Sequence, residues 1–98
     1  MKKKVTVAGS FIVDLMARTP HLPKPGETVK GLAFKMGPGG KGSNQAIAAK
    51  RANCDVTFIS KVGKDEFGEM ALNTFKNEGL DTKYIFEDEN LQTGTALI

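Results

Sequence analysis

The sequence has very few of the residues that build disulfides and metal clusters. Its 98 residues include one cysteine, Cys54, one histidine, His21, and no tryptophan. A single cysteine cannot form an internal disulfide, so we expect a reducing, cytoplasmic location. One cysteine and one histidine also fall short of the ligands of a structural zinc site, and we expect no metal site. His21 lies between prolines and is expected to be a loop residue.

Long apolar runs are also missing from the chain. No apolar stretch approaches the roughly 18–20 residues that are needed to cross a membrane, so we expect no membrane partner. Met1–Lys4 leads directly into Val5–Ala8, which is too short for the apolar part of a signal peptide and is typical of a strand. The chain stops within the expected strand at residues 95–98, Thr-Ala-Leu-Ile, with no polar tail or turn, and we expect a fragment of a longer protein or a gene product that is cut short.

Acidic residues are scarce in the first half of the chain. Residues 1–51 carry ten Lys and Arg against two Asp and Glu, whereas residues 52–98 carry four against nine. A basic half attracts anionic ligands such as a nucleotide or a sugar phosphate, but an uneven spread of charge over a partial domain explains the same counts. The Lys2–Lys4 run has no interleaved aromatic residues, so we expect no nucleic-acid partner.

What the sequence does have is an alternation of β-type and α-type segments. Strands are expected at residues 5–8, 28–36, 56–60, 84–86 and 92–98, and helices at 44–52 and 65–78. The second helix has an apolar stripe with a period of 3.6, made of Phe67, Met70, Ala71, Thr74 and Phe75. Gly79 is expected to end that helix. The alternation predicts an α/β layered fold with right-handed crossovers.

A proline cluster interrupts this alternation after the first strand. Pro20, Pro23 and Pro25-Gly26 fall within seven residues of one another. Such a cluster excludes a helix and a central strand but suits turns and edge strands. We therefore expect a flap or lid built out from the main sheet.

Residues 37–42, Gly-Pro-Gly-Gly-Lys-Gly, form the most unusual segment of the chain. Four glycines in six residues keep side chains away from whatever approaches the backbone. Ser43 follows as the expected N-cap of the first helix. Asn53 is expected to end that helix in the left-handed conformation.

This glycine segment has several possible functions. A phosphate-binding P-loop is excluded because Gly42, rather than Ser or Thr, follows Lys41. Gly37-x-Gly39-x-x-Gly42 matches the dinucleotide fingerprint, but the acidic residue expected at the end of the next strand is absent. Two interpretations remain beside it: a structural glycine turn, and a polyol site in which the backbone N–H groups of residues 39–42 face ligand oxygens at a helix N-terminus.

Asp14 is a carboxylate in an apolar run, just beyond the C-terminal end of a strand. In open α/β sheets ligands bind outside the carboxyl ends of the strands. A carboxylate at that place can accept two hydrogen bonds from neighbouring hydroxyls of a sugar. An Asp that caps a turn or faces solvent explains the same position equally well.

Residues 39–46, Gly-Gly-Lys-Gly-Ser-Asn-Gln-Ala, resemble the Gly-Gly-Lys-Gly-Ala-Asn-Gln-Ala block of ribokinase and its PfkB-type carbohydrate-kinase relatives. Further blocks similar to the family's occur in the same order at residues 7–14, 25–29, 59–68 and 93–98. The resemblance covers essentially the whole chain. It implies the N-terminal part of a doubly wound ribokinase-like α/β sandwich, with residues 1–98 as one partial domain and lid segments at approximately 14–36 and 92–98.

The resemblance also implies a function, the transfer of the γ-phosphate of ATP to a hydroxyl of a pentose, hexose or related sugar. The sugar-binding positions that it implies are Asp14, Gly39, Gly40, Lys41 and Asn44, with Ala96 and Ile98 packing on the sugar from the lid. The family's catalytic Asp, in a Gly-Ala-Gly-Asp motif, and its sites for ATP, Mg²⁺ and a possible monovalent cation lie outside this chain. The resemblance further implies a homodimer formed through the lid, and no kinase activity of residues 1–98 alone.

Ile12 departs from the family pattern, because ribokinases usually have Asn two residues before the sugar-binding Asp. The aliphatic side chain removes one hydrogen-bond donor and one acceptor, which leaves another sugar, a nucleoside or a sugar phosphate open as the substrate. Two other functions also stay open: a dinucleotide-binding oxidoreductase domain that uses Gly37, Gly39 and Gly42, and a non-catalytic sugar-binding or dimerisation module.

Overall fold

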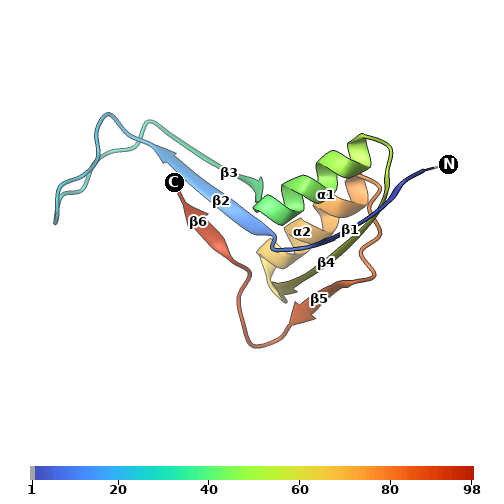
Figure 1. Ribbon diagram of the computed structural model, residues 1–98. Coiled ribbons are helices and arrows are strands. Elements are labelled where there is room, and N and C mark those ends of the chain that lie inside the picture. Colours follow the sequence, from blue (N-terminus) through green and yellow to red (C-terminus); the bar gives the residue numbers. More distant parts are fainter. Residues whose placement is uncertain (1) are drawn as a thin grey trace.

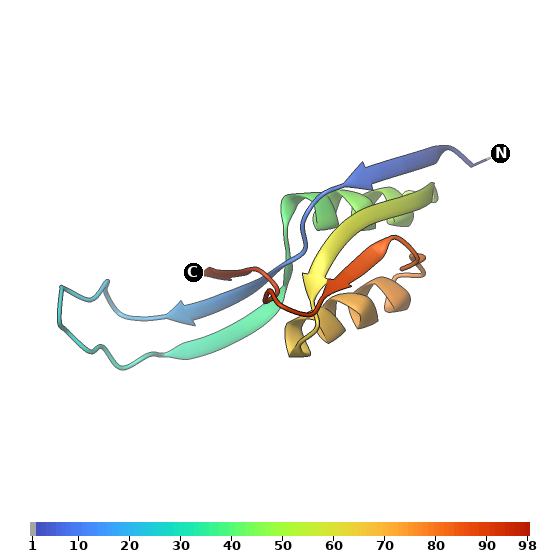
Figure 2. The same ribbon diagram turned by 90° about the horizontal axis from the view of Figure 1, so that it is seen from below.

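The computed structural model describes residues 2–98 and is long rather than round, with extents of 55 × 31 × 19 Å. Figure 1 shows a body of strands and helices on the right and a thin sheet that projects from it to the left. In Figure 2 the same sheet ends in a long loop at the far tip, away from the body. The expected α/β class is confirmed, and the elongation comes from this projecting sheet.

The body is built on a parallel sheet of strand order β1-β4-β5. Its strands are β1 (Lys4–Ala8), β4 (Asp55–Gly63) and β5 (Ile85–Asp88). Successive side chains of a strand point to opposite faces, and in β4 the buried hydrophobic residues are Val56, Phe58 and Val62, all on one face. That face therefore carries the core.

Two helices supply the other side of this core. They are α1 (Lys41–Arg51) and α2 (Glu66–Asn77). Phe75 of α2 is fully buried, with its ring centroid 5.1 Å from that of Phe58 and 5.8 Å from that of Phe11. Ala46 of α1 and Ala71 of α2 are also fully buried, so both helices pack closely. No helix in residues 2–98 is long and apolar enough to cross a bilayer.

The projecting sheet has the strand order β3-β2-β6, with β2 central. Its strands are β2 (Ile12–Arg18), β3 (Ala33–Gly39) and β6 (Thr95–Leu97). β3 runs antiparallel to β2, and β6 runs parallel to it. Pro38 fits within β3 because that strand lies at an edge of the sheet, where a missing N–H is tolerated.

The expected strand at residues 28–36 is wrong in its bounds, because β3 begins at Ala33 and continues to Gly39. Its partner β2 ends at Arg18, which pairs with Ala33, so earlier residues have no strand to pair with. The other expected elements lie close to their places, although β6 covers only three of the residues expected at 92–98. The strand β2 was not expected from the sequence.

The expected N-cap Ser43 is also wrong. The N-cap of α1 is Gly40, with φ of 98°, and the helix begins at Lys41. Ser43 is therefore already within the first turn, where its side chain is fully buried. The expected left-handed residue after the helix is confirmed, because Asn53 has φ of 68°.

The second helix follows its expectation closely. Asp65 caps it, accepting a hydrogen bond from the Gly68 N–H at 2.8 Å. Gly79 has φ of 76°, which confirms it as the residue that ends the helix.

Candidate functional site

Asp14 lies in the middle of the projecting sheet. It is within β2, and the expectation that it lies just beyond the C-terminal end of a strand is wrong. In β2 it is flanked by Gly37 of β3 on one side and Ala96 of β6 on the other. Its carboxylate packs directly over Gly39, since a Cβ built there would lie 2.5 Å from Asp14 Oδ2 and 2.7 Å from Cγ. The Asp14 carboxylate can therefore lie here only because residue 39 has no side chain.

Gly40 joins the projecting sheet to the first helix of the body. Its φ of 98° is a conformation that favours glycine, and a Cβ there would collide with the backbone oxygen of Ser10. The same Ser10 oxygen accepts a hydrogen bond from the Ser43 N–H at 3.3 Å. The start of α1 is thus fixed against the segment that leads into β2, close to the base of the strand that carries Asp14.

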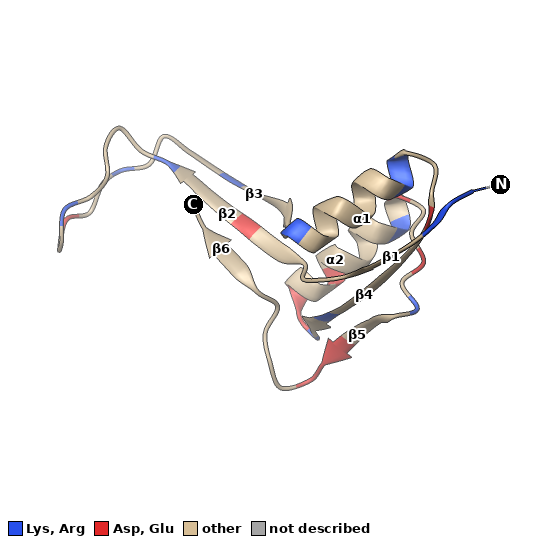
Figure 3. Cartoon of the chain, in the orientation of Figure 1, with Lys and Arg blue, Asp and Glu red and all other residues tan. Residues whose placement is uncertain are grey.

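No acidic residue offsets the positive N-terminal end of the α1 helix dipole. Its first turn has no Asp or Glu, and its first residue is Lys41, which is exposed. The first N–H groups of a helix lack partners within it and form the positive end of its dipole, so this end suits ligand oxygens. The first turn of α2 instead contains Glu66 and Glu69, after the cap Asp65. Figure 3 shows the contrast, with a basic start of α1 and an acidic start of α2.

Asn44 lies in the first turn of α1, where it is exposed, and its backbone N–H donates to the Gly40 oxygen at 2.9 Å. The structure thus places the expected residues Lys41 and Asn44 beside the glycine junction. Within residues 2–98 it forms no hydrogen bond or ion pair between either side chain and Asp14.

Strand β6 brings the C-terminal expected residues to the same sheet. Ala96 is the register partner of Asp14, and residues two apart on a strand share a face, which places Ile98 on that face as well. The Ile98 N–H donates to the Leu15 oxygen at 2.8 Å, and the Ala17 N–H donates to the Ile98 oxygen at 2.9 Å. Ile98 stays 63% exposed and is free to contact a ligand.

A hollow of about 310 Å³ lies beside Asp14, lined by Asp14, Met16, Lys35, Gly37 and Pro38. None of the ion pairs within residues 2–98 involves Asp14, so its carboxylate remains available. Met16 and Lys35, which are register partners, were not expected from the sequence. They could be found only from the pairing of β2 with β3, which residue spacing does not reveal.

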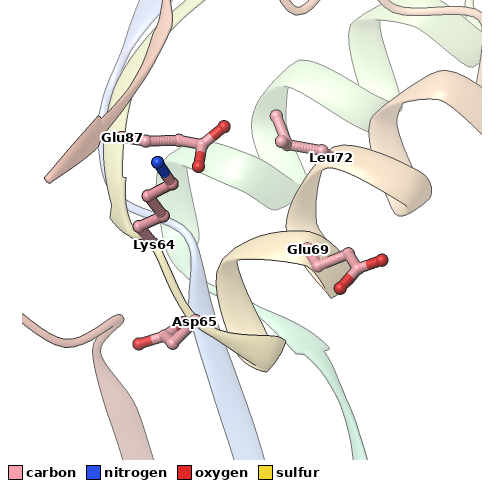
Figure 4. Close-up of a pocket in the computed structure, with 5 residues that line it drawn as sticks. All are labelled: Lys64, Asp65, Glu69, Leu72 and Glu87. Carbon is pink, nitrogen blue, oxygen red and sulfur yellow. The ribbon is translucent and has the colours of Figure 1, made fainter. Parts of the chain in front are cut away.

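A second hollow, of about 290 Å³, lies beside the start of α2 and is drawn in Figure 4. Its lining residues are Lys64, Asp65, Glu69, Leu72 and Glu87. The Asp65 carboxylate already accepts hydrogen bonds from the backbone of residues 68 and 93. Within residues 2–98 no three His, Cys, Asp or Glu side chains gather as metal ligands would. The hollow beside Asp14 is therefore the better candidate site.

The structure does not have the arrangement that the dinucleotide interpretation requires. Its fingerprint needs a strand, a glycine turn and a helix within one βαβ unit. Gly37 and Gly39 instead lie in β3, an edge strand of the projecting sheet, while the strand after α1 belongs to the body sheet. The three glycines thus serve a junction between two sheets.

Known proteins resemble this chain over nearly its whole length. Residues 2–98 match the family described as pfkB family carbohydrate kinase. The ribokinase of Haemophilus influenzae is 43% identical over 98 residues, which cover 100% of this chain and 32% of the ribokinase. The deoxyribokinase of Salmonella typhi is 40% identical over 94 residues, which cover 96% of this chain and 31% of the deoxyribokinase.

A solved structure extends the likeness to three dimensions. The Arabidopsis thaliana ribokinase complexed with ribose and ATP matches with a TM-score of 0.88 and 28% identity, over 99% of this chain and 32% of its own. The chain thus spans about a third of the length of the relatives that it matches.

Proposed function

The chain belongs to the pfkB family of carbohydrate kinases, and from this premise we propose that it is the sugar-binding region of an ATP-dependent sugar kinase. The kinase transfers the γ-phosphate of ATP to a hydroxyl of a pentose, hexose or related sugar. The observation that carries the proposal is the placement of Asp14, packed on Gly39 and facing a hollow of about 310 Å³. Residues 1–98 form one partial domain of this kinase.

Each part of the site has a separate task in binding. The Asp14 carboxylate accepts hydrogen bonds from two sugar hydroxyls, and such bonds to a charged acceptor are stronger than neutral ones. The N–H groups of residues 39–42, at the start of α1, donate to sugar oxygens, and Lys41 and Asn44 add side-chain donors. Ala96 and Ile98 cover the apolar face of the sugar from β6. Together these groups hold and orient the hydroxyl that attacks the phosphate.

The projecting sheet is the lid in this proposal, with segments at approximately 14–36 and 92–98. On the face away from Asp14, alternation places Leu15, Phe34, Met36 and Leu97. Phe34 is 66% exposed and Leu97 is 85% exposed. A twofold interface needs a surface that complements itself, which an apolar face does. We assign this face to a homodimer formed through the lid.

The dimer is tested by sedimentation of the purified chain. Phe34→Glu and Leu97→Glu are expected to give a monomer, since each places a charge in the apolar face. Leu22→Glu, in the tip loop and away from that face, is the matched control and is expected to leave the dimer intact. A monomeric parent chain, or dimers of both charged variants, would contradict the assignment.

The remaining requirements of the kinase lie outside residues 1–98. These are the ATP site, the catalytic Asp, Mg²⁺ and a possible monovalent cation. Mg²⁺, when bound, neutralises charge on the phosphates during transfer. Because residues 2–98 hold no cluster of metal ligands, we assign no step of this chain to a metal. We place the reaction in the cytoplasm, where ATP is supplied and Cys54 stays a free thiol.

Ile12 favours a sugar with one hydroxyl fewer than ribose. It lies on the Asp14 face of β2, two residues before Asp14, and its Cδ1 packs at Gly94, where a Cβ would lie 2.7 Å away. An aliphatic side chain cannot pair with a hydroxyl, and an unpaired hydroxyl in a closed site costs about 1–3 kcal/mol. A deoxypentose avoids this cost.

The test is a chimera in which this chain replaces the matching N-terminal third of the Haemophilus influenzae ribokinase. We expect this chimera to phosphorylate a pentose with ATP, whereas the purified 98-residue chain alone does not. We also expect a higher kcat/KM for deoxyribose than for ribose, with Ile12→Asn shifting the ratio toward ribose. A chimera that folds and binds ATP but phosphorylates no sugar of a pentose and hexose panel would overturn the proposal.

A further inference from the structure

Thr93 lies where the chain crosses from the body into the projecting sheet, between β5 and β6. It is 5% exposed, which is unusual for a polar residue in a loop, and a buried hydroxyl needs partners. The partners that it finds all belong to the body. The crossing is thus attached to the body at one defined residue.

Asp65 makes most of these attachments. Its Oδ2 accepts the Thr93 N–H at 2.9 Å, and its Oδ1 accepts the Thr93 hydroxyl at 2.7 Å. The hydroxyl oxygen of Thr93 in turn accepts the buried Gly63 N–H at 2.9 Å. Figure 4 shows Asp65 pointing away from Glu69, toward the segment that leads into β6. The hydrogen bonds from Thr93, and the one from Gly68, hold the pKa of Asp65 below its ordinary value.

Close packing at Gly63 supports the same attachment independently of the hydrogen bonds. A Cβ built on Gly63 would lie 2.6 Å from the Thr93 nitrogen and 2.6 Å from the Leu91 oxygen. The crossing therefore lies directly on the backbone at the end of β4. Capping of α2 alone requires neither this contact nor the pair of bonds to Thr93, because one bond to Gly68 caps the helix.

Few residues separate Thr93 from the part of β6 that lies beside Asp14. The Val13 N–H donates to the Gly94 oxygen at 3.0 Å, and β6 begins at the next residue, Thr95. Ala96, the register partner of Asp14, follows directly. A shift of Thr93 therefore moves the strand that lies beside the Asp14 carboxylate.

We infer that Asp65 and Thr93 form a latch that fixes β6 to the body and so positions Ala96 and Ile98 over the sugar. Both are positioning residues, since they act through β6 without touching the sugar. The effect on sugar binding rests on the proposed function, whereas the effect on β6 does not. The two can therefore be tested separately.

The first test is amide hydrogen exchange of the 98-residue chain. Thr93→Val keeps the shape of the side chain but removes the hydroxyl, and we expect the Ile98 amide to exchange about tenfold faster, the change expected for one lost hydrogen bond. Amides of the β2–β3 pairing are expected to change less than twofold. Thr93→Ser, which restores the hydroxyl, is expected to return the Ile98 rate to that of the parent.

A stability control distinguishes the loss of the latch from a lower stability of the whole chain. Leu80→Ala opens the buried core without touching the latch and is expected to speed exchange in β2–β3 and β6 alike. Unchanged Ile98 exchange in Thr93→Val, or an equal rise in the β2–β3 amides, would overturn the latch. Should Thr93→Val not fold, Asp65→Asn carries the same test, because it keeps one cap oxygen and removes the carboxylate charge.

The second test measures the KM for sugar of the Haemophilus chimera. Thr93→Val is expected to raise the KM for sugar about tenfold, because β6 then holds Ala96 and Ile98 over the sugar in a smaller fraction of molecules. We expect kcat and the KM for ATP to stay within twofold of the parent. Thr93→Ser is expected to recover the KM. Leu80→Ala is expected to leave it unchanged, because it speeds exchange through unfolding of the whole chain and leaves β6 attached in the folded molecules. A sugar KM that is insensitive to Thr93→Val in an active chimera would refute the positioning role. An inactive parent chimera would instead refute the proposed function, and the exchange test would still decide the latch.

Discussion

Replacing Gly39 with alanine places a methyl group where the Asp14 carboxylate now lies. The new Cβ would be 2.5 Å from Oδ2, whereas ordinary contact begins at 3.4 Å, so the carboxylate must retreat by about 0.9 Å. A hydrogen bond of about 2.7 Å to a sugar hydroxyl then becomes about 3.6 Å and is lost. Each such bond to a charged group contributes about 1.5–3 kcal/mol, so the loss of two costs at least about 3 kcal/mol. The sugar affinity should therefore fall about 150-fold or more.

The assay is the KM for sugar in the Haemophilus chimera, with the melting temperature measured alongside. Gly31→Ala adds the same methyl group two residues before β3, where its nearest neighbour is the Arg18 oxygen at an ordinary contact distance of 3.6 Å. We expect this control to leave the KM within twofold. A Gly39→Ala variant that binds sugar as tightly as the parent would refute the role given to the Asp14 carboxylate.

Two further predictions concern stability. Phe75→Ala removes a fully buried ring that packs between Phe11 and Phe58, and we expect chemical denaturation of the chain to show a loss of about 3–5 kcal/mol; a loss below 1 kcal/mol would contradict this core. Hydrogen bonds from Thr93 lower the pKa of Asp65 in the folded state. The ionised Asp65 therefore stabilises the fold above the ordinary carboxyl pKa of about 3.9, and this stabilisation is lost as the pH falls through the lower folded-state pKa. Melting between pH 7 and pH 2 should therefore show a smaller acid-induced drop for Asp65→Asn than for the parent, and equal drops would contradict the latch geometry.

The local elements could be predicted because their causes are local. The apolar period of 3.6 and Gly79 place the second helix nearly to the residue, and Asn53 adopts the expected left-handed conformation. The N-terminus of α1 could not be placed in this way. The helix starts at Lys41 because Gly40, with a positive φ, packs against the Ser10 oxygen. This contact joins segments that are 30 residues apart in the sequence.

The residues of the candidate site were named from a family resemblance, but their arrangement could not be derived from spacing. Asp14 meets Gly37 and Ala96 only through the pairing of β2 with two strands that are distant in sequence. Lys35 reaches the same hollow through that pairing. Thr93 gave no sequence signal as a positioning residue, because its partner Asp65 is 28 residues away.

The central claim, that Asp14 binds the sugar, is tested most directly by Asp14→Asn in the Haemophilus chimera. The amide keeps the size of the side chain but removes the charge and one of the two acceptor oxygens. We expect kcat/KM for the preferred pentose to fall about 150-fold, in line with about 3 kcal/mol for the weakened hydrogen bonds, while the KM for ATP stays within twofold. A variant that retains kcat/KM within threefold of the parent would contradict the account.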